Sequence, residues 1–491
     1  MRKRHVSLLI LFLCSFAWSK DYHVNDFGAK ADGLTLNTMA IQSAIDTASE
    51  HGGGRVIVGP GRYVTGSIYL KDDVELHLEP GAVLLGSLNP WDYIRDPYCH
   101  WTALIFAVKQ NHISITGDGI IDGRGFQVAT RIVDYARSGL CDIPLRFDRP
   151  AEGHRPENIH FRECNNVEIK NITLKNPACW TQQYDQCCNL LLDNVKVDAK
   201  CYWNNDGLDV VDCQHVIIRN CCIDSSDDAY CFKSHTKHGL SEDVLMENCI
   251  GRSSANGIKF GTATYGIFRN FTFRNNVIYD TYRSAITIAS VDGGRVEHVL
   301  VDGLKSIHTG NPFFIRVGTR HLQDIIPCIH DIVLKNIYAQ VPFDKPDAGY
   351  NYEGPIEDLP RNVCPSSIIG NPTYLIDNVF LDNIEIVYPG KADSTYAYRG
   401  HSYAELKAIP ELEFSYPEFS NWLELPAWAL YIRHANNITI HDVTFRVIDK
   451  DYRPAIVADD VSQLSYENLH ILQHGDSDKC QLIWYKPHRD E

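Results

Sequence analysis

The 491-residue sequence lacks three features that would each indicate a class of protein. Beyond residue 19 it has no run approaching the roughly 20 apolar residues of a membrane-spanning helix. It has no excess of basic residues, because 62 Asp and Glu face 46 Lys and Arg, for a net charge of −16 at pH 7. It has no CxxC pair with partners at metal-binding spacing. These absences argue against membrane insertion, against a nucleic-acid or membrane-surface partner, and against a zinc site.

The first nineteen residues have the composition of a secretory signal peptide. Basic residues at positions 2–4 precede the apolar run 6–13, and small residues stand at positions 17 and 19. This pattern predicts cleavage before Lys20, so we expect a secreted or periplasmic protein made of residues 20–491. Its net charge would be −19, since the leader holds three basic residues and no acidic one.

A short pattern recurs along most of the chain, namely x-[N/H/D]-[aliphatic/Phe]-x-[aliphatic/aromatic]-x-[N/G/D]. Its clearest copies are NHISITG from Asn111, NNVEIKN from Asn165, CNLLLDN from Cys188, QHVIIRN from Gln214, EDVLMEN from Glu242, RNFTFRN from Arg269 and EHVLVDG from Glu297. From the second copy onward the starts are 23, 26, 28, 27 and 28 residues apart. That spacing is too short for a βαβ unit with a full helix and is typical of one turn of a β-solenoid.

The repeat predicts an all-β fold that forms a single domain over residues 20–491. Stacked turns form parallel sheets, so equivalent positions of successive turns lie about 4.8 Å apart. The segment Asn37 to Glu50 has apolar residues at helical spacing, and we expect it to be a helix that caps the N-terminal end of the solenoid. A loop-rich insertion is expected around residues 340–435, where the run Tyr398 to Trp428 would either line a groove or simply cover the coil.

The sixteen cysteines become fifteen without the leader, so at least one thiol is unpaired. Export would permit disulfides. However, several cysteines lie at or beside the repeated strands, where cysteine serves as a small buried hydrophobe. We expect that packing role to outweigh a full disulfide framework.

Three carboxylates stand in two neighbouring turns of the repeat. Asp206 lies in the segment NNDG, and Asp227 and Asp228 follow one turn later. Stacking would bring them together within one or two strand spacings, where carboxylates resist ionising together and an acid separates from a base. That arrangement suits glycoside hydrolysis. The alternative is that each Asp bonds its own backbone at a corner, but clustered like charges without a role are costly.

These motifs resemble glycoside hydrolase family 28, the polygalacturonase family within the pectin-lyase-like superfamily, whose fold is a right-handed parallel β-helix. The resemblance includes NNDGLD, the following DD, and FGAKADG to GRYVTG over residues 27–66, and it extends from Asp26 to at least Arg320. It implies that Asp227 is the general acid and that Asp206 and Asp228 position and activate water. The implied mechanism is inverting, with no metal ion or other cofactor. It also implies a pectin-type or related acidic polysaccharide or oligosaccharide as substrate, and we expect a monomer.

The chain departs from the family pattern in the next two turns. A usual Gly-His-Gly motif reads Ala255-Asn256-Gly257, and an Arg-Ile-Lys motif that grips a galacturonate carboxylate is replaced by the run at residues 284–288. Asn256 can keep a hydrogen bond but carries no proton at neutral pH. Either the substrate lacks a uronate at that subsite or the positive charge comes from elsewhere. The candidate cations are Lys259, Arg283 and Arg316.

Further candidates for substrate binding are Asn205, Trp180 and Tyr265. The two aromatic rings could stack on sugar faces, although a ring beside a solenoid corner is as often plain packing. The candidate cations have the corresponding alternative of being solvated surface charges.

Two other functions remain open at this point. A β-helix polysaccharide lyase or epimerase would need an Arg or Lys base, often with calcium, and would release an unsaturated product. A carbohydrate-binding β-helix with decayed catalytic residues would fit the change at Asn256. The intact set of three aspartates argues against decay.

Overall fold

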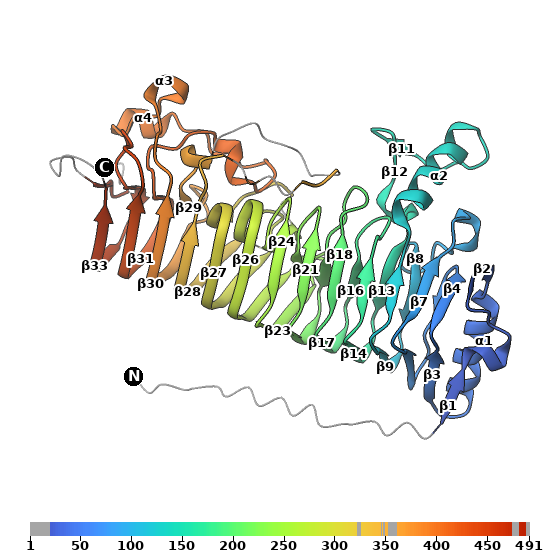
Figure 1. Cartoon of the computed structure of the whole chain (residues 1–491). Helices are drawn as coiled ribbons and strands as arrows, with labels where there is room; N and C mark the ends of the chain where they lie inside the picture. Colours follow the sequence, from blue (N-terminus) through green and yellow to red (C-terminus); the bar gives the residue numbers. More distant parts are fainter. Residues whose placement is uncertain are drawn as a thin grey trace, which may run out of the picture.

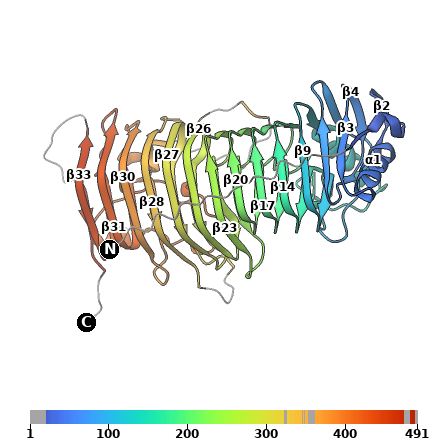
Figure 2. The ribbon, with the colours of Figure 1, turned by 90° about the horizontal axis from the view of Figure 1, so that it is seen from below.

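The computed structural model describes residues 20–321, 326–344, 346, 349–351, 361–473 and 481–487, so the predicted leader lies outside the described residues. Within them the strands pair in parallel from turn to turn and wind into an elongated β-helix (Figures 1 and 2). Each of the first turns adds one strand to each of three faces. The predicted all-β fold of stacked parallel strands is confirmed, whereas its handedness and its extent as one domain stay predictions.

The clear copies of the repeat motif lie on the first face of the β-helix, from β9 (Asn111–Thr116) onward. Its strands are β1 (Asp21–His23), β3 (Gly54–Val58), β6 (Val74–Leu78), β9 (Asn111–Thr116), β14 (Asn165–Lys170), β17 (Cys188–Asp193), β20 (Gln214–Arg219) and β23 (Leu240–Glu247). The second face follows each of these along the chain. Its strands are β2 (Asp32–Leu36), β4 (Gly61–Thr65), β7 (Ala82–Gly86), β10 (Ile120–Asp122), β15 (Thr173–Lys175), β18 (Lys196–Ala199), β21 (Cys222–Ser225) and β24 (Ile250–Ser253).

The third face completes each turn. Its strands are β5 (Ile68–Tyr69), β8 (Ala103–Val108), β13 (Glu157–Arg162), β16 (Gln182–Asp185), β19 (Leu208–Val211), β22 (Tyr230–Ser234), β25 (Ile258–Thr264), β29 (Ser366–Ile369), β32 (Ile456–Val461) and β34 (Leu482–Trp484). Longer strands of the later turns run on through corners. They are β26 (Ile267–Ser290), β27 (Arg295–Val317), β28 (Cys328–Gln340), β30 (Ile376–Tyr388), β31 (Leu430–Val447) and β33 (Leu464–Leu472).

The corner residues explain why Asn recurs in the repeat. Asn189 and Asn194, at the two ends of β17, both have φ of 56°, in the left-handed region that Asn tolerates better than most residues. Their side-chain amides also stack between turns. Asn189 Nδ2 donates to Asn165 Oδ1 at 2.9 Å, and Asn194 Nδ2 donates to Asn171 Oδ1 at 2.9 Å. The corners are therefore joined along the stack by side-chain hydrogen bonds as well as by backbone pairing.

Aliphatic and aromatic side chains from all three faces fill the interior. Cysteine contributes to this packing, since nine of the fourteen described cysteines are buried and all fourteen are free thiols. Cys164, Cys187 and Cys213 stand at equivalent positions of successive turns within the main core. The prediction that the cysteines mainly fill space is confirmed for the described residues.

A helix occupies the predicted N-terminal segment. It is α1 (Thr38–Glu50), which lies at the first turns of the stack and buries Ile41, Ala44, Ile45 and Ala48 (Figure 1). Its role as a cap stays a prediction. Short 3-10 helices stand in the loops, namely η1 (Val24–Phe27), η2 (Pro90–Asp92), η3 (Glu152–His154), η4 (Arg361–Val363) and η5 (Phe419–Trp422). No helix in the described part of the chain has the length and apolar character needed to cross a bilayer.

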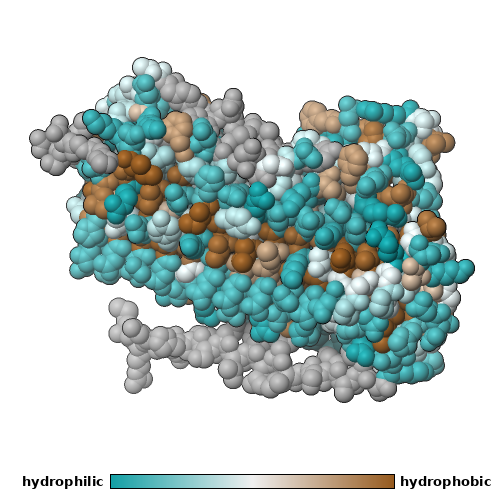
Figure 3. Space-filling view, viewed as in Figure 1, coloured by the Kyte–Doolittle hydropathy of each residue, from teal (hydrophilic) through white to brown (hydrophobic). Residues whose placement is uncertain are grey.

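Two groups of elements rise from one corner of the stack, between the second and third faces (Figure 1). The first holds α2 (Gly125–Arg137) and the antiparallel pair β11 (Leu145–Arg146) and β12 (Arg149–Pro150). The second holds α3 (Ser394–Ala397), α4 (Tyr403–Lys407) and η5. The space-filling outline dips between them, over the middle turns (Figure 3). The predicted loop-rich range 340–435 also contains β29 and β30, which belong to the coil.

Candidate active site

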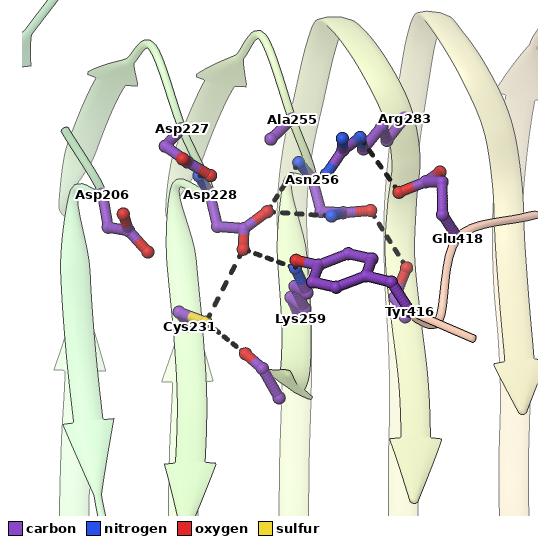
Figure 4. Close-up of polar contacts among 12 residues, drawn as sticks. Asp206, Asp227, Asp228, Cys231, Ala255, Asn256, Lys259, Arg283, Tyr416 and Glu418 are labelled. Atoms are coloured by element: carbon purple, nitrogen blue, oxygen red, sulfur yellow. Dashed lines mark hydrogen bonds and ion pairs between the residues drawn. The ribbon is translucent and has the colours of Figure 1, made fainter. Parts of the chain in front are cut away.

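The three predicted carboxylates come together at the corner between the second and third faces. Asp206 precedes β19, and Asp227 and Asp228 precede β22 in the next turn. The strand register pairs Leu208 with Tyr230, and Tyr230 with Ile258. That register places Asp206, Asp228 and Asn256 in one row along the corner, as Figure 4 shows.

A second row lies beside the first and is shifted by one residue. It runs from Asn205 through Asp227 and Ala255 to Arg283. Asn205 is buried and holds its own turn together, since its Nδ2 donates to the Cys179 carbonyl at 2.8 Å and its Oδ1 accepts from the Tyr202 amide at 2.8 Å. It therefore fixes the turn that carries Asp206.

Glycine follows Asp206 because the corner leaves no space for a side chain. A Cβ at Gly207 would stand 2.2 Å from Ile223 Cγ2 and 2.7 Å from the Ala229 carbonyl oxygen. The Gly207 amide also donates to the Asp228 carbonyl oxygen at 2.9 Å. The close approach of these two turns sets Asp206 beside the next pair of carboxylates.

Asp228 is held in its ionised form by the turn that follows it. Burial opposes its charge, but Lys259 Nζ at 2.8 Å and the Asn256 side-chain amide at 2.8 Å hold the pKa of Asp228 below its usual value. The Asn256 backbone amide donates to the same carboxylate at 3.0 Å. Asn256, at the position where the resemblance implies a histidine, thus acts as a hydrogen-bond donor to the neighbouring aspartate.

Asp227 has a raised pKa, in contrast to Asp228. Burial among protein atoms and the negative charges of Asp206 and Asp228 raise the pKa of Asp227 to about 7. Asp227 as a whole residue is half-buried, so part of it is exposed to solvent. Two adjacent residues therefore differ in protonation near neutral pH, as an acid and base pair requires.

A lysine that sequence reasoning missed lies beside Asp206. Lys233 Nζ is 3.1 Å from Asp206 Oδ2, contacts Asp209 Oδ1, and lies 3.7 Å from the centre of the Trp180 ring. Burial, together with Asp209 and Asp228, raises the pKa of Asp206 well above its usual range despite this cation. A signal for Lys233 was available, because a charged residue inside the buried strand YCFKS needs a partner.

Trp180, one turn before Asp206, packs between Lys233 and Trp101, whose ring centre is 4.8 Å away. Tyr265 lies just past the end of β25 opposite to Asn256 and stacks on His321. The structure thus brings Trp180 to the site and places Tyr265 away from the row of carboxylates. Their binding of sugar stays a prediction.

The segment 398–428 reaches the site with two side chains. The Tyr416 hydroxyl is 2.5 Å from Lys259 Nζ, and Glu418 Oε2 is 3.0 Å from Arg283 Nε (Figure 4). The segment therefore contacts the site at Lys259 and Arg283, and its lining of a groove stays a prediction. Arg316 is buried and donates to the backbone carbonyls of Gly370 and Glu411, so it joins this segment to the coil.

Asp206, Asp228 and Cys231 offer ligand atoms within 4.8 Å of one another, a spacing that could suit a metal ion. Both carboxylates already bond an ammonium group, Asp206 that of Lys233 and Asp228 that of Lys259. The positive charge between these turns thus comes from lysine.

Comparison with known proteins gives the same family as the motifs. The family model described as Glycosyl hydrolases family 28 matches residues 92–294. An exo-poly-alpha-D-galacturonosidase of Dickeya chrysanthemi is 27% identical over 305 residues, which are 53% of this chain and 50% of that protein. The chain therefore spans half the length of this curated relative.

Two solved structures share the fold over most of the chain. A family 28 exopolygalacturonase of Yersinia enterocolitica aligns with a TM-score of 0.67 at 20% identity, covering 91% of this chain and 78% of that one. A hyperthermoactive exopolygalacturonase of Thermotoga maritima aligns with a TM-score of 0.54 at 19% identity, covering 92% of each chain.

Proposed function

Because the chain belongs to glycosyl hydrolases family 28, we propose that it hydrolyses a glycosidic bond in a pectin-type or related acidic polysaccharide or oligosaccharide. The observation that carries this proposal is the opposite behaviour of two adjacent carboxyl groups. The pKa of Asp227 is raised to about 7, while that of Asp228 is held low. One group can donate a proton at the pH at which the other can accept one.

In the proposed reaction, Asp227 gives its proton to the oxygen of the leaving sugar as the glycosidic bond breaks. A water molecule forms the new bond to the anomeric carbon from the opposite face, and Asp228 takes the proton that this water releases. Asp206, bonded to Lys233, helps to orient that water. Proton exchange with solvent then restores the starting state. This is a single displacement that inverts the anomeric configuration.

A lyase or epimerase is less well supported, because those reactions need a basic residue that removes a proton from the sugar. The two lysines of the site are poor candidates. Burial alone would lower their pKa values, but the pKa of Lys259 is raised by Asp228 and that of Lys233 is raised by Asp206 and Asp209. Both therefore stay protonated. The buried carboxylates likewise support catalysis over a decayed site, since such a cluster is costly to keep.

The test is a product analysis with one substitution. The purified protein is incubated with pectin fragments, rhamnogalacturonans and algal galactans, and products are identified by mass and by new reducing ends. A hydrolase adds one water per cut, gives no unsaturated product that absorbs in the ultraviolet, and keeps its activity with a chelator. The configuration of the first product, read by NMR, tests inversion.

Asp227→Asn should lower kcat on the best substrate by 10² to 10⁴, the usual contribution of a general acid. The matched control is Asp198→Asn, which removes a half-exposed carboxylate from the second face. An Asp227→Asn enzyme with the wild-type kcat, or an unsaturated product, would show that the assignment is wrong.

We further propose that the protein is exported and acts as a monomer. The leader pattern at residues 1–19 supports export, and an expected substrate outside the cell agrees with it. Detection of the mature chain starting at Lys20 in the periplasm or medium, and its mass in solution, would test both.

A further inference from the structure

The cations of the site, among them Arg283, are already paired with the protein's own carboxylates. We propose that the sugar unit on the Arg283 side of the scissile bond is neutral, and that Glu418 sets this selectivity by pairing with Arg283. This inference rests on the proposed hydrolase function and specifies part of its substrate.

The pair Arg283 and Glu418 is built into the site. Arg283 lies two turns after Asp227 in the same row, so a sugar bound against Asp227 on that side meets Arg283 next. Arg283 Nε and Glu418 Oε2 are 3.0 Å apart, and the two side chains are only 6% and 4% exposed. Tyr416 covers the guanidinium, with its ring centre 5.8 Å away. The cation of this row is thus paired within the protein.

The other two cations of the site are also matched. Lys259 bonds Asp228 at 2.8 Å with 1% of its side chain exposed. Lys233 bonds Asp206 at 3.1 Å with 8% of its side chain exposed. Lys259 also bonds the Tyr416 hydroxyl at 2.5 Å, so it faces two groups of the protein.

The balance of cations and carboxyl groups in the site also disfavours a uronate. Three cations, Lys233, Lys259 and Arg283, face five carboxyl groups, which are those of Asp206, Asp209, Asp227, Asp228 and Glu418. Asp227 is protonated in the proposed active form, but each of the three cations already pairs with a carboxyl group of the protein. A uronate would therefore add a carboxylate for which the site has no spare cation. To bind Arg283 it would have to displace Glu418 and leave that carboxylate buried without its cation, which is strongly unfavourable.

A neutral sugar can bind without displacing Glu418 from Arg283. Its C6 substituent is a hydroxymethyl or methyl group, which the Tyr416 ring and hydroxyl can contact without any exchange of ion pairs. The site therefore discriminates by repulsion as well as by fit. A substrate that combines uronate with neutral units, or a neutral chain attached to an acidic backbone, satisfies this condition.

The test compares three probes of known structure. The first is an α-1,4-linked oligogalacturonide, and the second is the same oligosaccharide after carboxyl reduction, which converts galacturonate to galactose and keeps every linkage. The third is a rhamnogalacturonan oligosaccharide, in which uronate and a neutral deoxyhexose alternate. We expect the wild-type protein to hydrolyse the second or third probe with a kcat/KM at least tenfold above that of the first.

Glu418→Gln removes the carboxylate charge that pairs with Arg283 and should raise kcat/KM on the fully acidic probe relative to the neutral-containing probe by at least tenfold. The double variant Arg283→Gln/Glu418→Gln removes both charges and should show no such gain, because no cation is released. The control is Glu413→Gln, which removes one negative charge from the same segment; its carboxylate contacts Thr319 at 3.4 Å. Melting temperatures check that each variant folds.

Each outcome supports or overturns the inference that the sugar unit on the Arg283 side is neutral. A wild-type preference for the fully acidic probe overturns the inference even if every variant misfolds, and so does an unchanged preference in folded Glu418→Gln. An equal gain in the double variant would show that Arg283 is not the relevant cation. Absence of new reducing ends from all three probes would instead contradict the proposed hydrolase function on which the inference rests.

Discussion

Raising the pH through 7 should switch off the proposed acid, because Asp227 must be protonated to act. With a pKa of about 7, the protonated fraction falls from roughly 0.9 at pH 6 to roughly 0.1 at pH 8, so kcat/KM should fall roughly tenfold between these values. Asp228 must be ionised, and its lowered pKa keeps it so down to the acidic range. The profile should therefore have its plateau in mildly acidic buffer, with a basic limb near pH 7.

Lys259→Met provides an internal check of this explanation. Lys259 lowers the pKa of both Asp227 and Asp228, so its removal should move the basic and the acidic limbs to higher pH. The control is Lys196→Met, which removes an exposed lysine from β18 on the second face. That variant should keep the wild-type profile.

The assay measures kcat/KM on the best substrate from pH 4 to pH 9 at constant ionic strength, because kcat/KM reports the groups of the free enzyme. Two results would refute the reasoning. One is a rate that stays level from pH 5 to pH 9. The other is a basic limb that persists at the same pH in Asp227→Asn, since the titrating group would then be another residue.

Two further predictions concern stability. Lys233→Met leaves the buried carboxyl groups of Asp206 and Asp209 without their cation and should cost about 3–5 kcal/mol of unfolding free energy, measured by urea titration. Lys196→Met should change it by less than about 0.5 kcal/mol. Asp227→Asn should raise the melting temperature more at pH 8 than at pH 5. The raised pKa of Asp227 means that its contribution to stability is present below its unfolded value of 3.8 and is lost as the pH rises through 7, and Asn has no charge to bury. Equal effects at the two pH values would contradict that sign.

Much of the fold was predictable because the repeat contains both the alternation of a β-strand and the residues that form its corners. Each copy alternates apolar and polar residues and ends at a corner where Asn accepts a positive φ, as Asn189 and Asn194 do. The stacking distance then brings Asp206 to Asp227 and Asp228 without further information. Lys259 and Arg283 were also identified as candidate cations from their positions in the repeat.

Other parts of the site were not predictable from local patterns. Tyr416 and Glu418 lie in an insertion more than 130 residues from the cations that they contact, in a segment with no repeat. Arg316 is the opposite case. Its place in the repeat suggested a substrate-binding cation, but it donates to the backbone carbonyls of Gly370, just after β29, and of Glu411 in the insertion. Such partners depend on how a loop folds back on the coil.

The sequence by itself determined the solenoid and the meeting of three aspartates, because period and residue type are properties of the chain. Only the tertiary structure decided which carboxyl group holds its proton and which cations are free to bind a substrate. A pKa depends on burial and on charges from other turns. The pairing of Arg283 depends on Glu418, which the fold brings to it from the distant insertion.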